Sequence, residues 1–252
     1  MLHRGCILPH AFTAVLALAG CGLEPNPIGL LLPPVNVSEL STQIFQFTPP
    51  DLSSLTPLEK AALDAIWVGF EIYYKLFPAS VTAPPSAFNS VEDMLLASYH
   101  RLNNSGEGQN NPSTNKDVPG SLKLPLIRAS VFVLGAAVSK VIVDFSNMAD
   151  TLQQYPKVTV LDEVDSTTFE IVGARRSVAS LTEFKRFTEF ATEDVAASDS
   201  DVTSEVSSEI SSGTAVWVAC FAASWGFDPG TASVVYSIPV LLGYESIVFP
   251  HL

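Results

Sequence analysis

Positively charged residues are missing from the C-terminal part of the chain. The 252 residues include 13 Lys and Arg against 26 Asp and Glu, a formal net charge of −13, and no Lys or Arg follows Arg186. Affinity for nucleic acids comes mainly from Lys and Arg that displace counterions from phosphates. We therefore expect no nucleic-acid partner, and interpret the acid excess as a solvated surface.

Cysteine and histidine are also scarce. The three cysteines are Cys6, Cys21 and Cys220, and the chain has four histidines. Cys220 lies in an uncharged apolar run, which predicts a buried, unreactive thiol. His100 and His251 do not have the spacing of metal ligands. The sequence therefore predicts no metal site, no cofactor and no disulfide in a mature chain.

Motifs for common enzyme chemistry are absent as well. The chain has no nucleophile elbow, no P-loop and no dinucleotide-binding glycine motif. A hydrolase with a carboxylate pair stays open as an alternative, because such pairs meet in space and leave no spacing in the sequence. The densest acid cluster is Asp162, Glu163 and Asp165, at an expected hairpin tip where solvated acids are common. We expect a non-catalytic protein.

The N-terminus does carry a signal. One arginine, Arg4, precedes an apolar run from Ile7 to Ala19, and the run ends in Leu18-Ala19-Gly20-Cys21. A basic start, a short apolar core and small residues before a cut are the features of a secretory leader. The run is too short for a bilayer span, which needs about 20 residues.

The four residues that end at Cys21 resemble the lipobox of bacterial lipoproteins. That resemblance implies that residues 1–20 are a signal peptide, that cleavage occurs before Cys21, and that Cys21 carries the lipid. The residue that follows, Gly22, is not Asp, and by the same resemblance this favours the outer membrane, facing the periplasm or the exterior. An ordinary apolar N-terminus with a chance cysteine is the alternative.

A proline-rich segment follows the leader, with seven prolines between Glu24 and Pro57. Proline removes backbone donors and favours extended chain, so residues 21–55 are predicted to form a semi-rigid tether. Within it, Leu30–Leu32 and Ile44–Phe47 are apolar and are expected to dock on the body. Residues 56–252 are then expected to form one globular, mainly helical domain, because 47% hydrophobic and 15% charged residues exclude a disordered chain.

Several segments predict helices. Thr56, Pro57 and Glu59 have the pattern of a capping box, and an apolar stripe at helical spacing follows until Pro78. A second helix is expected over Ser90–Leu102, and another begins at Ser180. Leu126–Tyr155 is apolar on nearly every face and predicts a central buried helix. Its cluster of β-branched residues leaves a strand as the alternative.

Other segments are assigned differently. Lys157–Leu161 and Thr167–Val172 alternate in polarity and predict a β-hairpin. Asn103–Gly120 is a polar loop that fits a calcium loop poorly. Asp194–Ser212 predicts either a thin amphipathic helix or a linker. The expected fold class is therefore mainly α with a small β-hairpin, an α+β single domain on an N-terminal tether.

The C-terminal region from Gly213 to Phe249 contains two apolar runs separated by the turn Asp228-Pro229-Gly230. The first run is short for a span, and Pro239 and Glu245 would be costly in lipid in the second. We expect the two runs to lie side by side as a hairpin of strands or helices, packed within protein, with contact to the membrane left open.

These observations give three hypotheses for function. The first is a non-catalytic envelope lipoprotein with a structural or assembly role, whose partners are the membrane, through the lipid on Cys21, and other proteins, copies of itself included. The second is a subunit of a shell or large complex that retains its N-terminus. The third is an envelope hydrolase that uses a carboxylate pair.

Overall fold

The computed structural model consists mainly of antiparallel sheets. It describes residues 31–81, 83–85, 87–104, 127–128, 139–149, 156–162, 168–171, 174–178, 186–188, 190, 192 and 195–250. A six-stranded sheet has the order β13-β12-β3-β4, with β14 also paired to β12 and β6 to β3. A five-stranded sheet has the order β1-β2-β7-β8-β9, and a three-stranded sheet has the order β11-β10-β5.

The strands of the six-stranded sheet are β3 (Trp67–Phe77), β4 (His100–Arg101), β6 (Ile127–Arg128), β12 (Val216–Asp228), β13 (Ser233–Tyr236) and β14 (Val240–Ile247). Those of the five-stranded sheet are β1 (Val35–Ser41), β2 (Ile44–Thr48), β7 (Ser139–Asp144), β8 (Lys157–Asp162) and β9 (Thr168–Ile171). The remaining elements are β5 (Asn103–Asn104), β10 (Ala174–Val178), β11 (Arg186–Thr188), α2 (Pro57–Ile66), α3 (Val91–Leu96), α4 (Ser204–Ser211) and the 3₁₀ turn η2 (Ser146–Ala149).

The predicted fold class is wrong. Within the described ranges the α-helices are only α2, α3 and α4, all short, whereas strands build the three sheets. The error begins at Trp67, where α2 ends and β3 starts. Ile66, Phe70 and Tyr74 are four residues apart, which fits one face of a helix. A separation by an even number of residues also places side chains on one face of a strand. The residues between them are buried too, so the segment is a strand with both faces covered.

The predicted central helix over Leu126–Tyr155 is also wrong. Its described parts contain the strands β6 and β7, followed by η2. In β7, Val141 and Val143 are fully buried, and the backbone pairs with β2 on one side and β8 on the other. β-branched side chains favour a pleated surface, and the alternative of a strand was therefore the better one.

Other local predictions are confirmed. The capping box is present at the start of α2, with Thr56 and Glu59 bonded reciprocally. Ser90 caps α3, although this helix ends at Leu96 rather than at Leu102. β8 and β9 form the expected hairpin. Of the segment Asp194–Ser212, for which a helix and a linker were both open, only Ser204–Ser211 form the amphipathic helix α4. The helix expected from Ser180 is wrong where it can be compared with the structure: its start lies outside the described residues, but Arg186–Thr188 form the strand β11, paired with β10.

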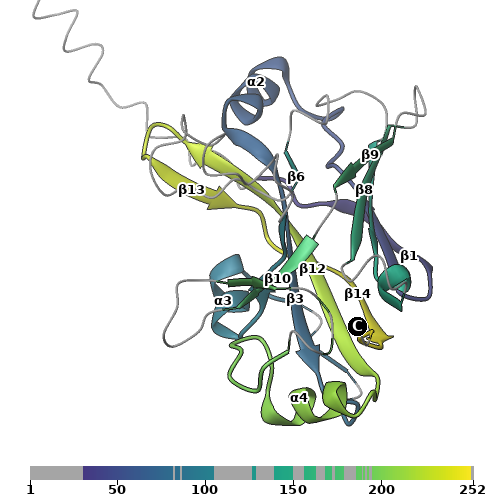
Figure 1. Cartoon of the computed structure of the whole chain (residues 1–252). Helices are drawn as coiled ribbons and strands as arrows, with labels where there is room; N and C mark the ends of the chain where they lie inside the picture. Colours follow the sequence, from purple (N-terminus) through teal and green to yellow (C-terminus); the bar gives the residue numbers. More distant parts are fainter. Residues whose placement is uncertain are drawn as a thin grey trace, which may run out of the picture.

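The two long strands β3 and β12 form the centre of the molecule. They pair antiparallel from Trp67 with Gly226 to Phe77 with Trp217, and Figure 1 shows them running side by side along its length. β13 and β14 both pair with β12, so the two C-terminal apolar runs lie side by side as strands. Among the described residues, no helix has the length and the apolarity to span a membrane.

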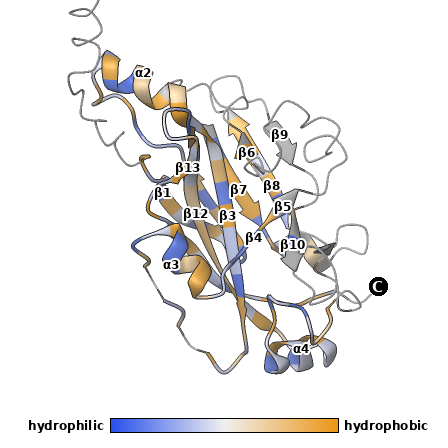
Figure 2. Cartoon of the chain, turned by 90° about the vertical axis from the view of Figure 1, so that its left-hand side faces the viewer, coloured by the Kyte–Doolittle hydropathy of each residue, from blue (hydrophilic) through white to orange (hydrophobic). Residues whose placement is uncertain are grey.

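One face of the six-stranded sheet packs against the five-stranded sheet and forms the main core. Phe45, Phe47 and Val143 from one sheet and Ile72 and Val218 from the other belong to one buried cluster. Figure 2 shows hydrophobic residues concentrated on these strands. The two sheets are close enough that a Cβ on Gly243 would lie 2.2 Å from the Phe45 ring, so glycine is required there.

The proline-rich segment takes part in this packing. Residues 21–30 lie outside the described residues, but Leu31 is buried and β1 and β2 belong to the five-stranded sheet. Phe45 and Phe47 are fully buried, which confirms that Ile44–Phe47 docks on the body. Residues 31–50 therefore belong to the described part of the folded body.

The opposite face of the sheet carries a smaller, aromatic cluster. Tyr73, Tyr99 and Phe221 form its buried centre, together with Val91 and Met94 of α3. The rings meet edge to face, for example Tyr99 and Phe221 with centroids 5.2 Å apart. The helix α3 therefore covers this face, and the main core lies on the other side of β3.

Candidate functional site

The sequence-predicted site residues are placed as follows. Cys21 and His251 lie outside the described residues, as do Glu163 and Asp165 of the acid cluster. Cys220 is a free, fully buried thiol on β12, and its burial raises its pKa, which agrees with an unreactive side chain. His100 on β4 is half-buried beside Tyr74, with ring centroids 6.2 Å apart.

The structure brings together charged residues that the sequence analysis did not single out. Tyr73 and Tyr74 are consecutive on β3 and point to opposite faces of the sheet, where each donates a hydrogen bond to a buried carboxylate. Tyr74 donates to Asp201 and Tyr73 to Glu71. Each carboxylate also forms an ion pair with an arginine. Two buried polar clusters therefore flank the same strand.

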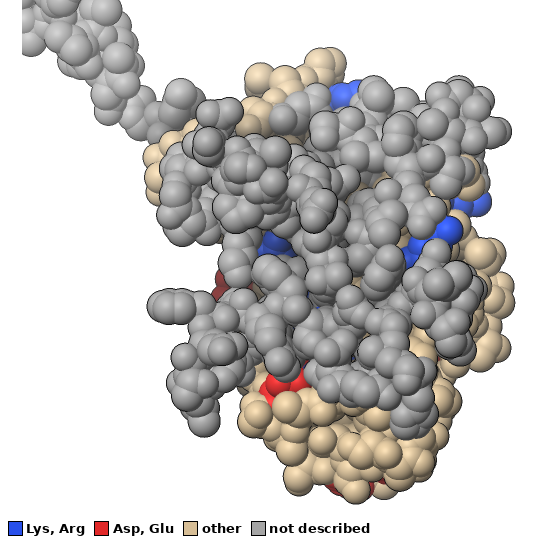
Figure 3. All heavy atoms as spheres, viewed as in Figure 1, with Lys and Arg blue, Asp and Glu red and all other residues tan. Residues whose placement is uncertain are grey.

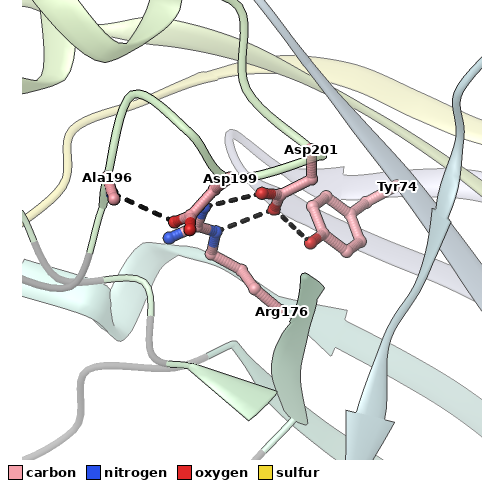
Figure 4. Close-up of polar contacts among 5 residues, drawn as sticks. All are labelled: Tyr74, Arg176, Ala196, Asp199 and Asp201. Carbon is pink, nitrogen blue, oxygen red and sulfur yellow. Dashed lines mark hydrogen bonds and ion pairs between the residues drawn. The ribbon is translucent and has the colours of Figure 1, made fainter. Parts of the chain in front are cut away.

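The cluster on the Tyr74 side is centred on Arg176 (Figure 4). Its guanidinium binds Asp201 through two bonds, Nε to Oδ2 at 2.8 Å and Nη2 to Oδ1 at 2.7 Å. The same Nη2 lies 3.1 Å from Asp199, whose carboxylate also accepts the backbone N–H of Ala196 at 3.0 Å. The Tyr74 hydroxyl lies 2.5 Å from Asp201 Oδ2.

The Arg176 cluster holds distant segments of the fold together. Burial alone would lower the pKa of the guanidinium, but the hydrogen bonds and charge of Asp201 outweigh it and hold the pKa above its usual value. Arg176 is completely buried on β10, whereas Asp199 and Asp201 belong to the segment that precedes α4. The two-bond geometry therefore ties that segment to β10 and β3.

The cluster on the Tyr73 side is centred on Glu71. Its Oε1 lies 2.6 Å from Arg101 Nη1, and its Oε2 accepts the Tyr73 hydroxyl. The Glu71 side chain is 1% exposed, whereas that of Arg101 is 18% exposed. This ion pair is therefore in partial contact with solvent through its arginine.

Tyr236 on β13 extends the Glu71 cluster. Tyr73 and Trp225 are close enough to its hydroxyl to lower its pKa in part. Burial and the negative charge of Glu71 raise its pKa to about 12. Tyr73 has a raised pKa for the same two reasons. Both hydroxyls therefore stay protonated at neutral pH, and that of Tyr73 donates to Glu71.

A cavity of about 510 Å³ adjoins Tyr236. It lies between the start of α3 and the β12–β13 hairpin. Val91, Val235 and Ile238 contribute apolar walls, Tyr236 contributes an aromatic ring, and Glu92 and Asp228 contribute carboxylates. The volume is in the range of small-molecule sites.

The cavity is better suited to binding than to hydrolysis. A carboxylate-pair hydrolase needs one carboxyl group that stays protonated near neutral pH. The Asp228 pKa is instead lowered by hydrogen bonds from Thr231 and the Gly230 N–H, and the Glu92 side chain is exposed. No group of three or more His, Cys, Asp or Glu side chains that could hold a metal occurs in the part of the chain that the structure describes.

Comparison with known proteins gives no match: no family model fits the chain, and no curated protein or solved structure is similar to it at a significant level.

One feature of the sequence could have indicated the Glu71 cluster. Glu71 stands in the apolar run Trp67–Phe77, and a charge within such a run implies a buried partner. The partner Arg101 is 30 residues away by its number, and Asp201 is 127 residues from Tyr74. No local spacing could have identified either pair.

Proposed function

We propose that this chain is a non-catalytic lipoprotein of the bacterial cell envelope, with a structural or assembly role. The observation that carries the proposal is the lipobox-like sequence at Leu18–Cys21, followed closely by a folded β-sheet body. In this proposal residues 1–20 are removed and Cys21 carries the lipid. The partners are then a membrane, through Cys21, and other envelope proteins or further copies of the chain.

The distance between anchor and body supports this arrangement. Leu31 is buried in the body and is ten residues beyond Cys21. Extended chain spans at most about 3.3–3.6 Å per residue, so the body is held within about 35 Å of the lipid. Pro25 and Pro27 stiffen this short link. A lipid on Cys21 would therefore hold the body close to the bilayer surface.

The buried charges and the buried thiol of the described residues support a non-catalytic role. Among these residues, the buried charges of Arg176, Asp201 and Glu71 are held in ion pairs. The Cys220 thiol is buried, and its pKa is raised. None of these four groups is an activated nucleophile.

The decisive experiment is membrane fractionation of the full-length chain expressed in bacteria, combined with intact mass. We expect the wild type to stay with membranes in high salt and to have the mass of a chain that starts at an acylated Cys21. The Cys21→Ser variant should be released, because nothing else near the N-terminus replaces the lipid. Cys6→Ser is the matched control, since it removes a leader cysteine and keeps the lipid site.

The result that favours the alternative is equally specific. An unmodified chain that starts at Met1 would contradict the lipoprotein and favour a subunit of a shell or large complex. Native electrophoresis of the solubilised protein then tests the assembly role. A species of one chain only, at all concentrations, would contradict that role.

A further inference from the structure

The cavity beside Tyr236 has a distinctive combination of walls and charges. Its apolar part comes from Val91 of α3, from Val235 of β13 and from Ile238, which follows β13 and is 46% exposed. An exposed isoleucine at the margin of a cavity of about 510 Å³ leaves apolar surface available to a ligand. An occupant with an apolar body would bury that surface.

The charge around the cavity has one sign. Glu92 and Asp228 both line it, and no Lys or Arg occurs among its described lining residues. Hydrogen bonds from Gly230 N (2.8 Å) and Thr231 Oγ1 (2.8 Å) lower the pKa of Asp228, so its carboxylate is ionised. A carboxylate has about four acceptor positions, so these bonds leave room for a further donor. An anionic ligand would be repelled here, and a cationic one attracted.

The aromatic wall favours the same ligand charge. Tyr236 also lines the cavity. Ammonium groups bind to the faces of aromatic rings, so a tyrosine that lines the same cavity as two carboxylates is a suitable environment for an organic cation.

We propose that the cavity between α3 and β13 is a binding site for a small organic cation with an apolar body, such as an alkylammonium. The apolar body contacts Val91, Val235 and Ile238, and the ammonium group binds Glu92, Asp228 and the ring of Tyr236. This site is independent of Cys21, so it exists whether or not the chain is lipidated.

The test is isothermal titration of the full-length protein with hexylammonium, and with hexanol and hexanoate as probes of equal chain length. We expect saturable binding at one site for hexylammonium, weaker binding for hexanol and none for hexanoate. The hexylammonium affinity should fall with added salt, because the carboxylates are partly screened. Equal binding of the three probes, or no binding of hexylammonium, would overturn the proposal.

Variants locate the site. Glu92→Gln and Asp228→Asn should each weaken hexylammonium binding by about three- to ten-fold, as for charge-assisted hydrogen bonds at a partly exposed site. Asp93→Asn is the matched control, because Asp93 is next to Glu92 on α3 but does not line the cavity. It should leave the affinity unchanged, and a loss as large as that of Glu92→Gln would show a general charge effect and overturn the site.

A variant that fills the cavity gives a second, independent test of the binding site. Ser233 lines the cavity and is exposed, so Ser233→Trp places a large ring there without disturbing the core. Hexylammonium binding should be lost in this variant and retained in Leu58→Trp, at a leucine of α2 that is 80% exposed. Unchanged binding in Ser233→Trp would place the ligand elsewhere and contradict the proposal.

Discussion

The two sides of β3 handle a buried charge in different ways. On the Tyr74 side, Arg176 is completely buried and bound to Asp201 by two parallel hydrogen bonds. On the Tyr73 side, Glu71 is buried but its partner Arg101 keeps part of its side chain exposed. The first arrangement is structural, since the Arg176 and Asp201 side chains are both shielded from solvent. The second retains solvent contact and lies beside a cavity.

The strand β3 therefore contributes to a fully buried ion pair on one side and to a partly exposed ion pair on the other. The Arg176 cluster joins β10, β3 and the segment before α4, three parts of the chain that are distant in sequence. The charge of the Glu71 cluster acts on Tyr236, which lines a cavity of about 510 Å³. Variants on the two sides of β3 should therefore differ in stability and in pH dependence.

The largest effect should come from Asp201→Asn. Among the described residues, this change leaves the buried Arg176 charge with Asp199 as its charged partner, and breaking a buried ion pair costs about 3–5 kcal/mol. Urea denaturation should show this loss in the free energy of unfolding. Asp199→Asn should cost clearly less, because Asp199 makes a single, longer bond of 3.1 Å to Arg176. Equal losses would contradict the central role of Asp201.

A smaller loss is expected for Glu71→Gln. The amide keeps the shape, and Arg101 can hydrate because its side chain is 18% exposed. We expect a loss of about 1–3 kcal/mol in the free energy of unfolding, as for a hydrogen bond to a charged group. A loss as large as that of Asp201→Asn would show that the Glu71 side is equally closed to solvent. A double-mutant cycle with Arg101→Met measures the coupling directly.

The paired tyrosines give a finer test. Tyr74→Phe should cost about 1 kcal/mol, because Asp201 keeps both bonds to the guanidinium. Tyr73→Phe should in addition change the titration of Tyr236, because Tyr73 contributes to the pKa of Tyr236. Ultraviolet absorbance titration of tyrosinate measures this change. If Tyr74→Phe altered the Tyr236 titration equally, the two sides of β3 would not be independent.

The smallest effect concerns alkaline pH. The pKa of Tyr236 is raised from 10.0 to about 12, so the folded state prefers the protonated hydroxyl. This contribution is complete below pH 10 and is lost as the pH rises toward 12, because the unfolded chain releases the proton first. At pH 11 the loss should be on the order of 1 kcal/mol. Tyr236→Phe should make the fall in stability between pH 9 and 11 shallower, and an unchanged profile would contradict the assignment.

The sequence predicted local features better than long-range ones. The cap of α2 and the β8–β9 hairpin depend on a few adjacent residues, and both were predicted correctly. The assignment of Trp67–Phe77 failed because an apolar run buried on both faces has no clear periodicity. Its neighbours on the sheet, β12 and β4, decide that it is a strand. Tertiary pairing overrides local propensity in such a segment.

The polar clusters and the cavity lay beyond sequence analysis for a related reason. Arg176 and Asp201 meet only because β10 and the segment before α4 converge on Tyr74. Glu92 and Asp228 line one cavity although they belong to α3 and to the β12–β13 hairpin. Other acidic residues lie on the surface, for example near α4 at the lower end of the molecule in Figure 3. Nothing in the sequence distinguishes these residues from Glu92 and Asp228.

The buried thiol of Cys220 can report how often the central sheet opens. Cys220 lies in the middle of β12, between Tyr74 on β3 and Gly243 on β14, and its pKa is raised by burial. An alkylating reagent reacts with the thiolate, so it can modify this side chain only when the central strands separate. In a Cys6→Ser, Cys21→Ser background, the labelling rate therefore counts openings of the sheet itself. Frayed termini and mobile loops open at far lower free energy, and they leave this rate unchanged.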